Sequence, residues 1–293
     1  MLMLSGAEAK VKQHAERLEK TKSLLMLVIV SHGEEVAEES LSITRSKLRL
    51  ELRGLLQPCD YNFIPQNLSG TCEWIWTNPV FARWVTIGAT GPVESVDRIM
   101  CIYGTGGCGK SVLAASIVKR LEHQDKVSSL FSFRAVRGSQ RKLVDFLRTY
   151  LWHLLRHASD EDLYPIYTPL MKPLSMNEHN LGDAIKLAGE LVGSTLYCVI
   201  DAVDESLDDW SRSEDGSLNY ILELIRTVPN LCLILLGREP ALRAAMSIIP
   251  SNIEITEDVV MHDIYKFIDV ELDRSLNVQT PAIRELVRQS LQE

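Results

Sequence analysis

The sequence lacks the features by which several classes of protein are recognised. Its six cysteines form no C-x-x-C pair, so neither a zinc ribbon nor a thioredoxin-like site is indicated. It has no dense cluster of lysine and arginine, and its formal net charge is −8, so nucleic acid is not an expected partner. The apolar run from Leu24 to Val30 has only seven residues, whereas a membrane span needs about 20, so no transmembrane segment is predicted.

A secretory signal and a metal centre are not indicated either. The residues before the apolar run carry acids as well as bases, and no cleavage pattern of small residues follows it. His153 and His157 stand four apart, but no third ligand lies nearby in the sequence. Cys101, Cys198 and Cys232 lie in apolar runs, where a thiol behaves as a small hydrophobe. This use of cysteine is typical of a reducing compartment, and we expect a cytoplasmic protein.

The composition is that of a folded globular protein. Of 293 residues, 46% are hydrophobic and 24% are charged, which supports one large domain or two smaller ones. Residues 6–56 are rich in helix formers and are broken at Ser31–Gly33. This pattern predicts two helices, either a solvated pair or a coiled coil that binds a partner.

From residue 98 onward, short apolar runs alternate with helical stretches. The helical stretches are expected at residues 110–123 and, interrupted near Pro165, Pro169 and Pro173, at 140–189, with two more helices after Asp258. Alternation of this kind predicts a mostly parallel sheet covered on both faces, that is, a three-layer α/β sandwich with five strands. The strands are expected at residues 98–103, 127–133, 196–200, 231–236 and 253–255.

A glycine-rich loop follows the first expected strand. The eight residues are Gly104, Thr105, Gly106, Gly107, Cys108, Gly109, Lys110 and Ser111. They match G-x-x-x-x-G-K-[ST], and the loop stands between an expected strand and an expected helix, as a P-loop requires. Glycines let successive N–H groups point at phosphate oxygens. We therefore expect the loop to bind a nucleoside triphosphate, with Lys110 on the β- and γ-phosphates and Ser111 on Mg²⁺.

Acidic residues follow the third expected strand. Asp201 stands at its carboxyl end, where ligands of open α/β sheets bind, and is expected to hold Mg²⁺ through water. Asp204 and Glu205 follow three and four residues later, and one of them is expected to polarise the attacking water. Arg238 follows the fourth strand, either as a sensor of the γ-phosphate or as an exposed side chain paired with Glu239.

A segment rich in tryptophan precedes the first strand. Thr71 is predicted to cap one short helix, and Asn78 followed by Pro79 is predicted to begin another. These helices are expected to pack aromatic side chains onto the main domain. Alternatively, the segment also closes over the base of a bound nucleotide. Its tryptophans are Trp74, Trp76 and Trp84.

The glycine-rich loop, the run from Asp201 to Glu205 and the arginine after the fourth strand together resemble the NACHT class of signal-transduction ATPases (STAND NTPases). The discriminating part is the double acid in Asp-Ala-x-Asp-Glu. Residues 70–76, with Phe81 and Trp84, resemble the segment before the P-loop of fungal NOD-like receptors, including heterokaryon-incompatibility proteins. Gly237 departs from this class, which usually has Ser or Thr before the arginine.

This resemblance implies a signalling switch with slow hydrolysis. It implies exchange of diphosphate for triphosphate, and assembly with copies of the chain or with a partner of the NOD-like receptor type. The alternatives are a freestanding P-loop ATPase or small-molecule kinase, and a scaffold that binds nucleotide without significant turnover. ATP and GTP are both open as the ligand.

The expected organisation has four parts. Residues 1–57 form an N-terminal helical segment, and 58–95 form a linker with the short tryptophan-rich helices. Residues 96–257 form the nucleotide-binding domain of NACHT type, and 258–293 the start of a helical domain that is cut short.

Overall fold

The computed structural model describes residues 17–22, 47–59, 68–87, 94–134, 141–159, 162–172, 176–211, 213 and 216–275. The chain forms two compact units, of which one comprises residues 1–60 and 143–193 and the other residues 61–142 and 194–293. The second of these, the α/β unit, contains the sheet. The expected helix break at Ser31–Gly33, and residues 60–67 and 88–93 of the expected linker at 58–95, lie outside the described residues.

The α/β unit is built on five parallel strands, as the sequence predicts. They are β1 (Ile99–Gly104), β2 (Val127–Ser132), β3 (Leu196–Asp201), β4 (Leu231–Gly237) and β5 (Ser251–Ile255). Their order across the sheet is β2-β3-β4-β1-β5. Because β4 lies between β1 and β3, the strand that precedes the glycine-rich loop and the strand that ends in Asp201 are not neighbours.

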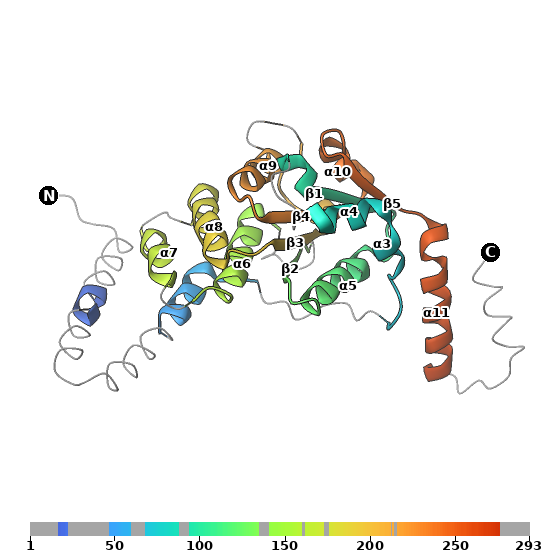
Figure 1. The fold of residues 1–293 in the computed structure, drawn as a ribbon, viewed down its shortest axis with the longest axis horizontal. Coiled ribbons are helices and arrows are strands. Elements are labelled where there is room, and N and C mark those ends of the chain that lie inside the picture. The colour runs from blue at the N-terminus through green and yellow to red at the C-terminus, as the bar shows by residue number, and fades with distance from the viewer. Residues whose placement is uncertain are drawn as a thin grey trace, which may run out of the picture. The chain divides into compact units, whose positions relative to one another are not determined.

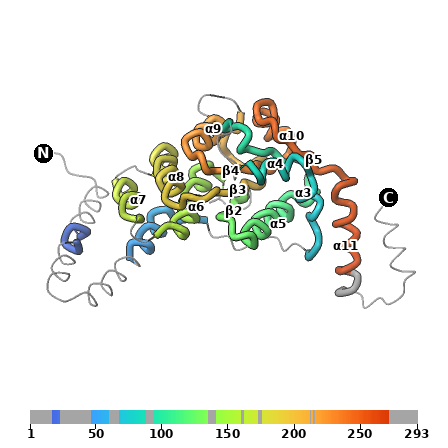
Figure 2. The backbone as a smooth tube through the Cα atoms, viewed as in Figure 1, coloured from blue at the N-terminus to red at the C-terminus, as the bar shows by residue number. Residues whose placement is uncertain are grey.

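Helices cover both faces of this sheet (Figures 1 and 2). Helix α5 (Lys110–Glu122) packs on one face, and α9 (Ser217–Thr227) and α10 (Glu239–Met246) pack on the other. Successive side chains of a strand point to opposite faces, and Met100 and Ile102 share one buried cluster with Leu113 and Ile117 of α5. The fold is therefore the three-layer α/β sandwich that the sequence predicts.

The burial of the central strands on both faces explains why their sequences are continuous apolar runs. Every residue of β3 and β4 is buried, as expected for parallel strands covered on both faces. Burial raises the pKa of the Cys101 and Cys198 thiols to about 12, so both stay protonated and pack as apolar groups.

The tryptophan-rich segment forms two helices, α3 (Trp74–Thr77) and α4 (Pro79–Ile87). The cap at Asn78 is confirmed, since its side-chain oxygen accepts hydrogen bonds from the N–H groups of Val80 and Phe81 at 2.9 and 3.3 Å. The cap at Thr71 is wrong. Its hydroxyl donates to the carbonyl of Leu68 at 2.7 Å, and Glu73 is the residue that precedes α3.

Aromatic side chains of this segment pack onto the sheet unit, as expected. Phe81 and Trp84 are fully buried, and Trp84 contacts Tyr197 of β3 edge to face with ring centroids 5.5 Å apart. The indole N–H of Trp84 donates to the carbonyl of Arg98 at 3.0 Å, which satisfies its one polar group.

The other unit is helical. It contains residues 47–56, α6 (Leu143–Leu155), α7 (Leu163–Leu170) and α8 (Glu178–Val192). The expected helical stretch at 140–189 is interrupted, between α6 and α7 and between α7 and α8, and the second of these intervals includes the expected interruption near Pro173. Pro165 and Pro169 themselves do not interrupt a helix, because both lie within α7. Pro165 is the third residue of that helix, where the N–H has no partner within the helix, so the missing donor costs little.

Helix α11 (Glu257–Ser275) follows β5 directly and accounts for the first of the two helices expected after Asp258. The second lies outside the described residues. In the part of the chain that the structure describes, no helix has both the length and the apolar character needed to cross a membrane. The expected domain boundaries at 57, 95 and 257 stay predictions.

Candidate phosphate and magnesium site

The connections of the sheet diverge between β1 and β4. The chain leaves β1 through α5 on one face and leaves the neighbouring β4 through α10 on the other. In open α/β sheets ligands bind at such a point, outside the carboxyl ends of the strands. The glycine-rich loop follows β1 there, and Arg238 follows β4.

The glycine-rich loop turns from β1 into α5 over five residues, 105–109. Gly107 and Gly109 have φ of +83° and +88°, a conformation that only glycine adopts at little cost. Lys110 is the first residue of α5, so the N–H groups at the start of that helix border the loop. Such a helix start favours an anion, and the loop therefore has the backbone of a phosphate site.

Gly104, at the end of β1, is required for close packing rather than for an unusual φ. A Cβ there would lie 2.7 Å from the sulfur of Cys108 and 3.2 Å from the backbone oxygen of Ile255 in β5. The start of the loop is therefore held against the edge of β5.

The Lys110 side chain folds over the same loop. Its ammonium group donates to the carbonyl oxygens of Gly104 at 2.9 Å and Thr105 at 2.5 Å, and it lies 3.6 Å from the sulfur of Cys108. The charge of Lys110 is thus held at the loop by carbonyl oxygens. Phosphate oxygens are stronger acceptors for an ammonium group, because the hydrogen bond is charge-assisted on both sides.

Asp201 is a buried carboxylate at the end of β3, with 2% of its surface exposed. One oxygen, Oδ2, accepts a hydrogen bond from the hydroxyl of Ser132 at 3.0 Å, while Oδ1 is buried without a partner among the described residues. Burial raises the pKa of Asp201, and the nearby hydroxyls of Ser111 and Ser132, the backbone N–H of Ala202 and the charge of Lys110 oppose this rise. A buried carboxylate oxygen without a hydrogen-bond partner lowers the stability of the fold, and a bound cation would offset this loss.

These residues fit magnesium as a ligand pair completed by other oxygens. Ser111 supplies a hydroxyl and Asp201 a carboxylate, which are ligands that hard cations prefer. No cluster of three or more His, Cys, Asp or Glu among the described residues would hold a metal by itself. A magnesium ion held here would therefore take its remaining ligands from water and phosphate.

A short turn carries the other two acids. Ala202 has φ of +56°, which is rare for a residue with a Cβ, and it precedes the 3-10 turn η3 (Val203–Glu205). The N–H of Glu205 closes this turn on the carbonyl of Ala202 at 2.8 Å. The unusual conformation at Ala202 thus redirects the chain immediately after Asp201.

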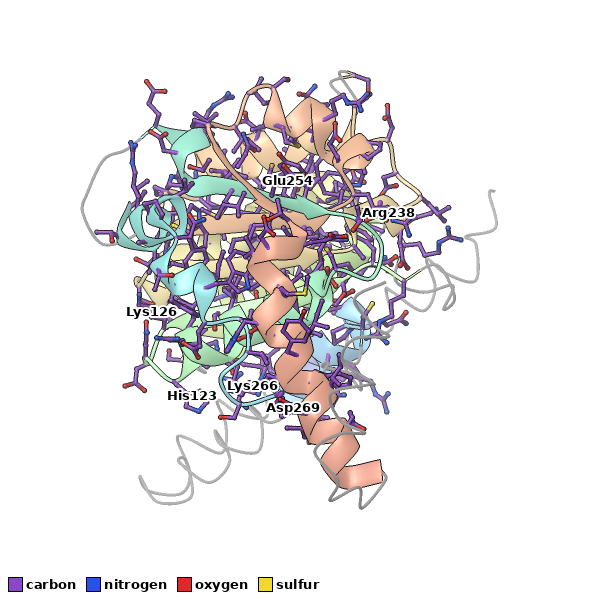
Figure 3. All side chains as sticks on the ribbon, turned by 90° about the vertical axis from the view of Figure 1, so that its right-hand side faces the viewer. His123, Lys126, Arg238, Glu254, Lys266 and Asp269 are labelled. Carbon is purple, nitrogen blue, oxygen red and sulfur yellow. The ribbon has the colours of Figure 1, made fainter. Side chains whose placement is uncertain are left out.

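Arg238 joins this turn to the glycine-rich loop. Its Nε lies 3.1 Å from Oδ2 of Asp204, and its backbone N–H donates to Oδ1 of the same carboxylate at 3.1 Å. Its guanidinium also borders Gly106, because a Cβ on that glycine would lie 3.5 Å from Nη2. Figure 3 shows Arg238 and Glu254, a residue of β5, at the end of the sheet where α11 begins. Arg238 is paired with Asp204, not with Glu239, which pairs with Arg243 at 3.2 Å.

Most of the candidate residues from the sequence meet at this edge of the sheet. The loop, Asp201, Asp204 and Arg238 are connected by the contacts above, and Glu205 lies in the same turn as Asp204. Sequence reasoning did not find Ser132, which is paired in register with Asp201 across β2 and β3. Its only sequence signal is a hydroxyl at the end of an apolar strand.

Comparison with known proteins adds a family. Residues 70–238 match the family model described as "Nephrocystin 3, N-terminal", which covers more than half of the chain and is not a NACHT model. No curated protein matches the chain. Among solved structures, a chain in the "Structure of E. coli MS115-1 HORMA:CdnC:Trip13 complex" is similar, with 15% identity and a TM-score of 0.34. That match covers 85% of this chain and 72% of the other.

Proposed function

The chain belongs to the Nephrocystin 3, N-terminal family, and from this and from its candidate site we propose that it is a magnesium- and nucleoside-triphosphate-binding signalling switch. The observation that carries the proposal is a buried carboxylate oxygen of Asp201 that has no hydrogen-bond partner among the described residues, on the strand two places from β1 and its glycine-rich loop. The loop supplies donors for phosphate and the carboxylate supplies a ligand for Mg²⁺.

Each residue has a role in this proposal. The N–H groups of residues 104–111 surround the phosphates, and Lys110 exchanges its carbonyl partners for phosphate oxygens. Ser111 and Asp201 hold the magnesium ion, which neutralises phosphate charge when bound. Asp204 or Glu205 orients the attacking water, and Arg238 contacts the γ-phosphate.

We place the switch in the NACHT type of STAND NTPase, as in fungal NOD-like receptors, because of the double acid after Asp201 and the arginine after β4. A switch of this kind hydrolyses slowly, works in the cytoplasm and assembles with copies or with a receptor partner. The family match concerns residues 70–238 and leaves this placement a proposal.

The direct experiment is mass spectrometry of the nucleotide released from purified protein, followed by calorimetry with Mg²⁺ and a non-hydrolysable triphosphate. We expect a bound adenine or guanine nucleotide, and tight binding that Lys110→Ala abolishes, since this change removes a charge-assisted contact. Thr86→Ala is the control, because its hydroxyl donates to the carbonyl of Ala82 within α4 and is not part of the candidate site. Equal affinity of the parent chain and Lys110→Ala would exclude the loop as the site.

The steady-state rate of nucleotide hydrolysis distinguishes a switch from a metabolic enzyme. We expect a steady-state rate far below about 10 s⁻¹, the value typical of metabolic enzymes. A rate of that size would favour a freestanding ATPase or kinase, and tight binding without any turnover would favour a scaffold.

A further inference from the structure

Asp204 and Arg238 hold each other through two contacts that use both carboxylate oxygens. Oδ2 faces Nε of the side chain and Oδ1 accepts from the backbone N–H, each at 3.1 Å. The carboxylate is largely buried, with 19% of its side chain exposed, whereas the side chain of Arg238 is 63% exposed. The fixed partner is therefore Asp204, and the guanidinium is the group that is free to move.

The position of β4 in the sheet places this pair between the two halves of the candidate site. β4 lies between β1, which leads into the glycine-rich loop, and β3, which leads into η3. Arg238, the residue after β4, consequently contacts Asp204 on one side and borders Gly106 on the other. One guanidinium thus lies within reach of a carboxylate and of the loop expected to hold phosphate.

Gly237 makes the pairing sterically feasible. A Cβ at this position would lie 3.4 Å from Cβ of Val203, which is ordinary contact, and 3.3 Å from Oδ1 of Asp204, which is tighter than most such contacts and would press on the carboxylate. A Ser or Thr there, which is usual in the NACHT class that the sequence resembles, would press on the Asp204 carboxylate. The glycine is thus matched to Asp204.

We infer that Asp204 is a positioning residue that competes with the γ-phosphate for Arg238 and so sets the preference between triphosphate and diphosphate. This inference rests on the proposed nucleotide-binding function. A diphosphate has no γ-phosphate and leaves the ion pair intact. A triphosphate must draw the guanidinium away from Asp204, so part of the gain from the new contact is offset by the ion pair that is lost.

The size of this effect follows from the exposure of the pair. Ion pairs between exposed side chains contribute little, about 0.2–1 kcal/mol, and here one partner is mostly buried. Removing the ion pair between Asp204 and Arg238 is therefore expected to raise the ratio of triphosphate to diphosphate affinity by about two- to fivefold.

The test is a double-mutant cycle read by calorimetry with Mg²⁺, using a non-hydrolysable triphosphate and the matching diphosphate. Asp204→Asn keeps an oxygen for the backbone N–H of Arg238 but removes the ion pair. We expect it to raise the ratio of triphosphate to diphosphate affinity by about two- to fivefold in the parent chain. In the Arg238→Gln background the same change is expected to have a smaller effect, because only the general loss of a negative charge remains.

Two further variants separate the competition from other causes. Gly237→Ser displaces the carboxylate without changing any charge, and we expect it to shift the ratio in the same direction as Asp204→Asn. Glu223→Gln is the control, because it breaks an exposed ion pair with Arg226 on α9 and is expected to leave the ratio unchanged.

The outcomes are distinct. If the parent chain binds neither nucleotide, the proposed function fails and the competition fails with it. If the parent chain binds both and Asp204→Asn changes the ratio equally with and without Arg238, only the competition is overturned.

Discussion

Because Gly104 has no side chain, the glycine-rich loop can pack closely against the sheet. Its Cα faces the sulfur of Cys108 and the backbone of Ile255 at distances that leave no room for a methyl group. The glycine pattern in the sequence predicts a phosphate loop, but it does not reveal that this first glycine is needed for contact with β5, because β5 lies about 150 residues away along the chain.

We therefore expect Gly104→Ala to destabilise the protein and to weaken nucleotide binding. Overpacking of this kind typically costs about 1–3 kcal/mol, measurable as a lower midpoint of urea unfolding. Adding Cys108→Ala should restore part of the loss, since it removes the sulfur but not Ile255. A midpoint for Gly104→Ala equal to that of the parent chain would contradict the close contact.

Asp201 gives a prediction on stability and pH. Burial raises the pKa of this carboxyl, so the folded protein binds its proton more tightly than the unfolded chain does. The contribution of this group to stability therefore falls as pH rises from the unfolded value of about 3.9 through the raised folded pKa. Above the raised folded pKa the buried carboxylate is ionised, and it lowers the stability of the protein unless a bound cation offsets its charge.

Asp201→Asn should accordingly raise the melting temperature at pH 7 in the presence of a chelator, by roughly 2–4 °C for each kcal/mol gained. The difference should shrink as the pH falls below about 3.9, where the parent carboxyl becomes protonated in both the folded and the unfolded state. The same variant should lose the stabilisation that magnesium and nucleotide together give the parent. A melting temperature at pH 7 below that of the parent would show that the carboxylate is stabilised rather than strained.

At the scale of the elements, Arg98 connects a helix end to a strand start. Its guanidinium is buried and donates to the carbonyls of Ile225 and Val228, at the end of α9, and of Leu231, at the start of β4. The three distances are 2.6, 2.8 and 3.1 Å. Carbonyls at a helix end need such partners, because the helix itself offers none.

Arg98→Met is expected to lower the free energy of unfolding by about 3 kcal/mol, since it leaves buried carbonyls without donors. Arg98→Lys should recover only part of this, because a compact ammonium does not replace the planar fork of an arginine. Arg226→Met, which breaks the exposed pair with Glu223 on α9, should cost less than about 1 kcal/mol and serves as the control in urea unfolding.

The strands illustrate what the sequence predicts and what it does not. Apolar runs such as Leu231–Gly237 and Leu196–Asp201 place each strand within one or two residues of its observed bounds, because full burial leaves a continuous signal. Strand order is set by contacts between distant segments, so the insertion of β4 between β1 and β3 has no local signature. Arg238 meets Asp204, and Ser132 meets Asp201, because of this strand order. Neither pairing can therefore be predicted from the local sequence.

At the scale of the whole molecule, the proposed function requires that nucleotide state change assembly. The γ-phosphate shifts an equilibrium only if it binds one state better than the other. Light scattering is therefore expected to show larger particles with magnesium and a non-hydrolysable triphosphate than with diphosphate, and Lys110→Ala should abolish the difference. Equal sizes in both nucleotides would mean that this chain does not assemble on exchange.

The segment before α3 is held to helix α11 by two contacts. Asp263 of α11 accepts a hydrogen bond from the backbone N–H of Cys72 at 2.8 Å, and the Lys266 ammonium fills the space that a Cβ on Gly70 would need. Helix α11 follows β5, whose Ile255 packs against Gly104, the first residue of the glycine-rich loop. Because Val260 also packs α11 against the core cluster, this helix links the segment before α3 to the strand that lies beside the glycine-rich loop.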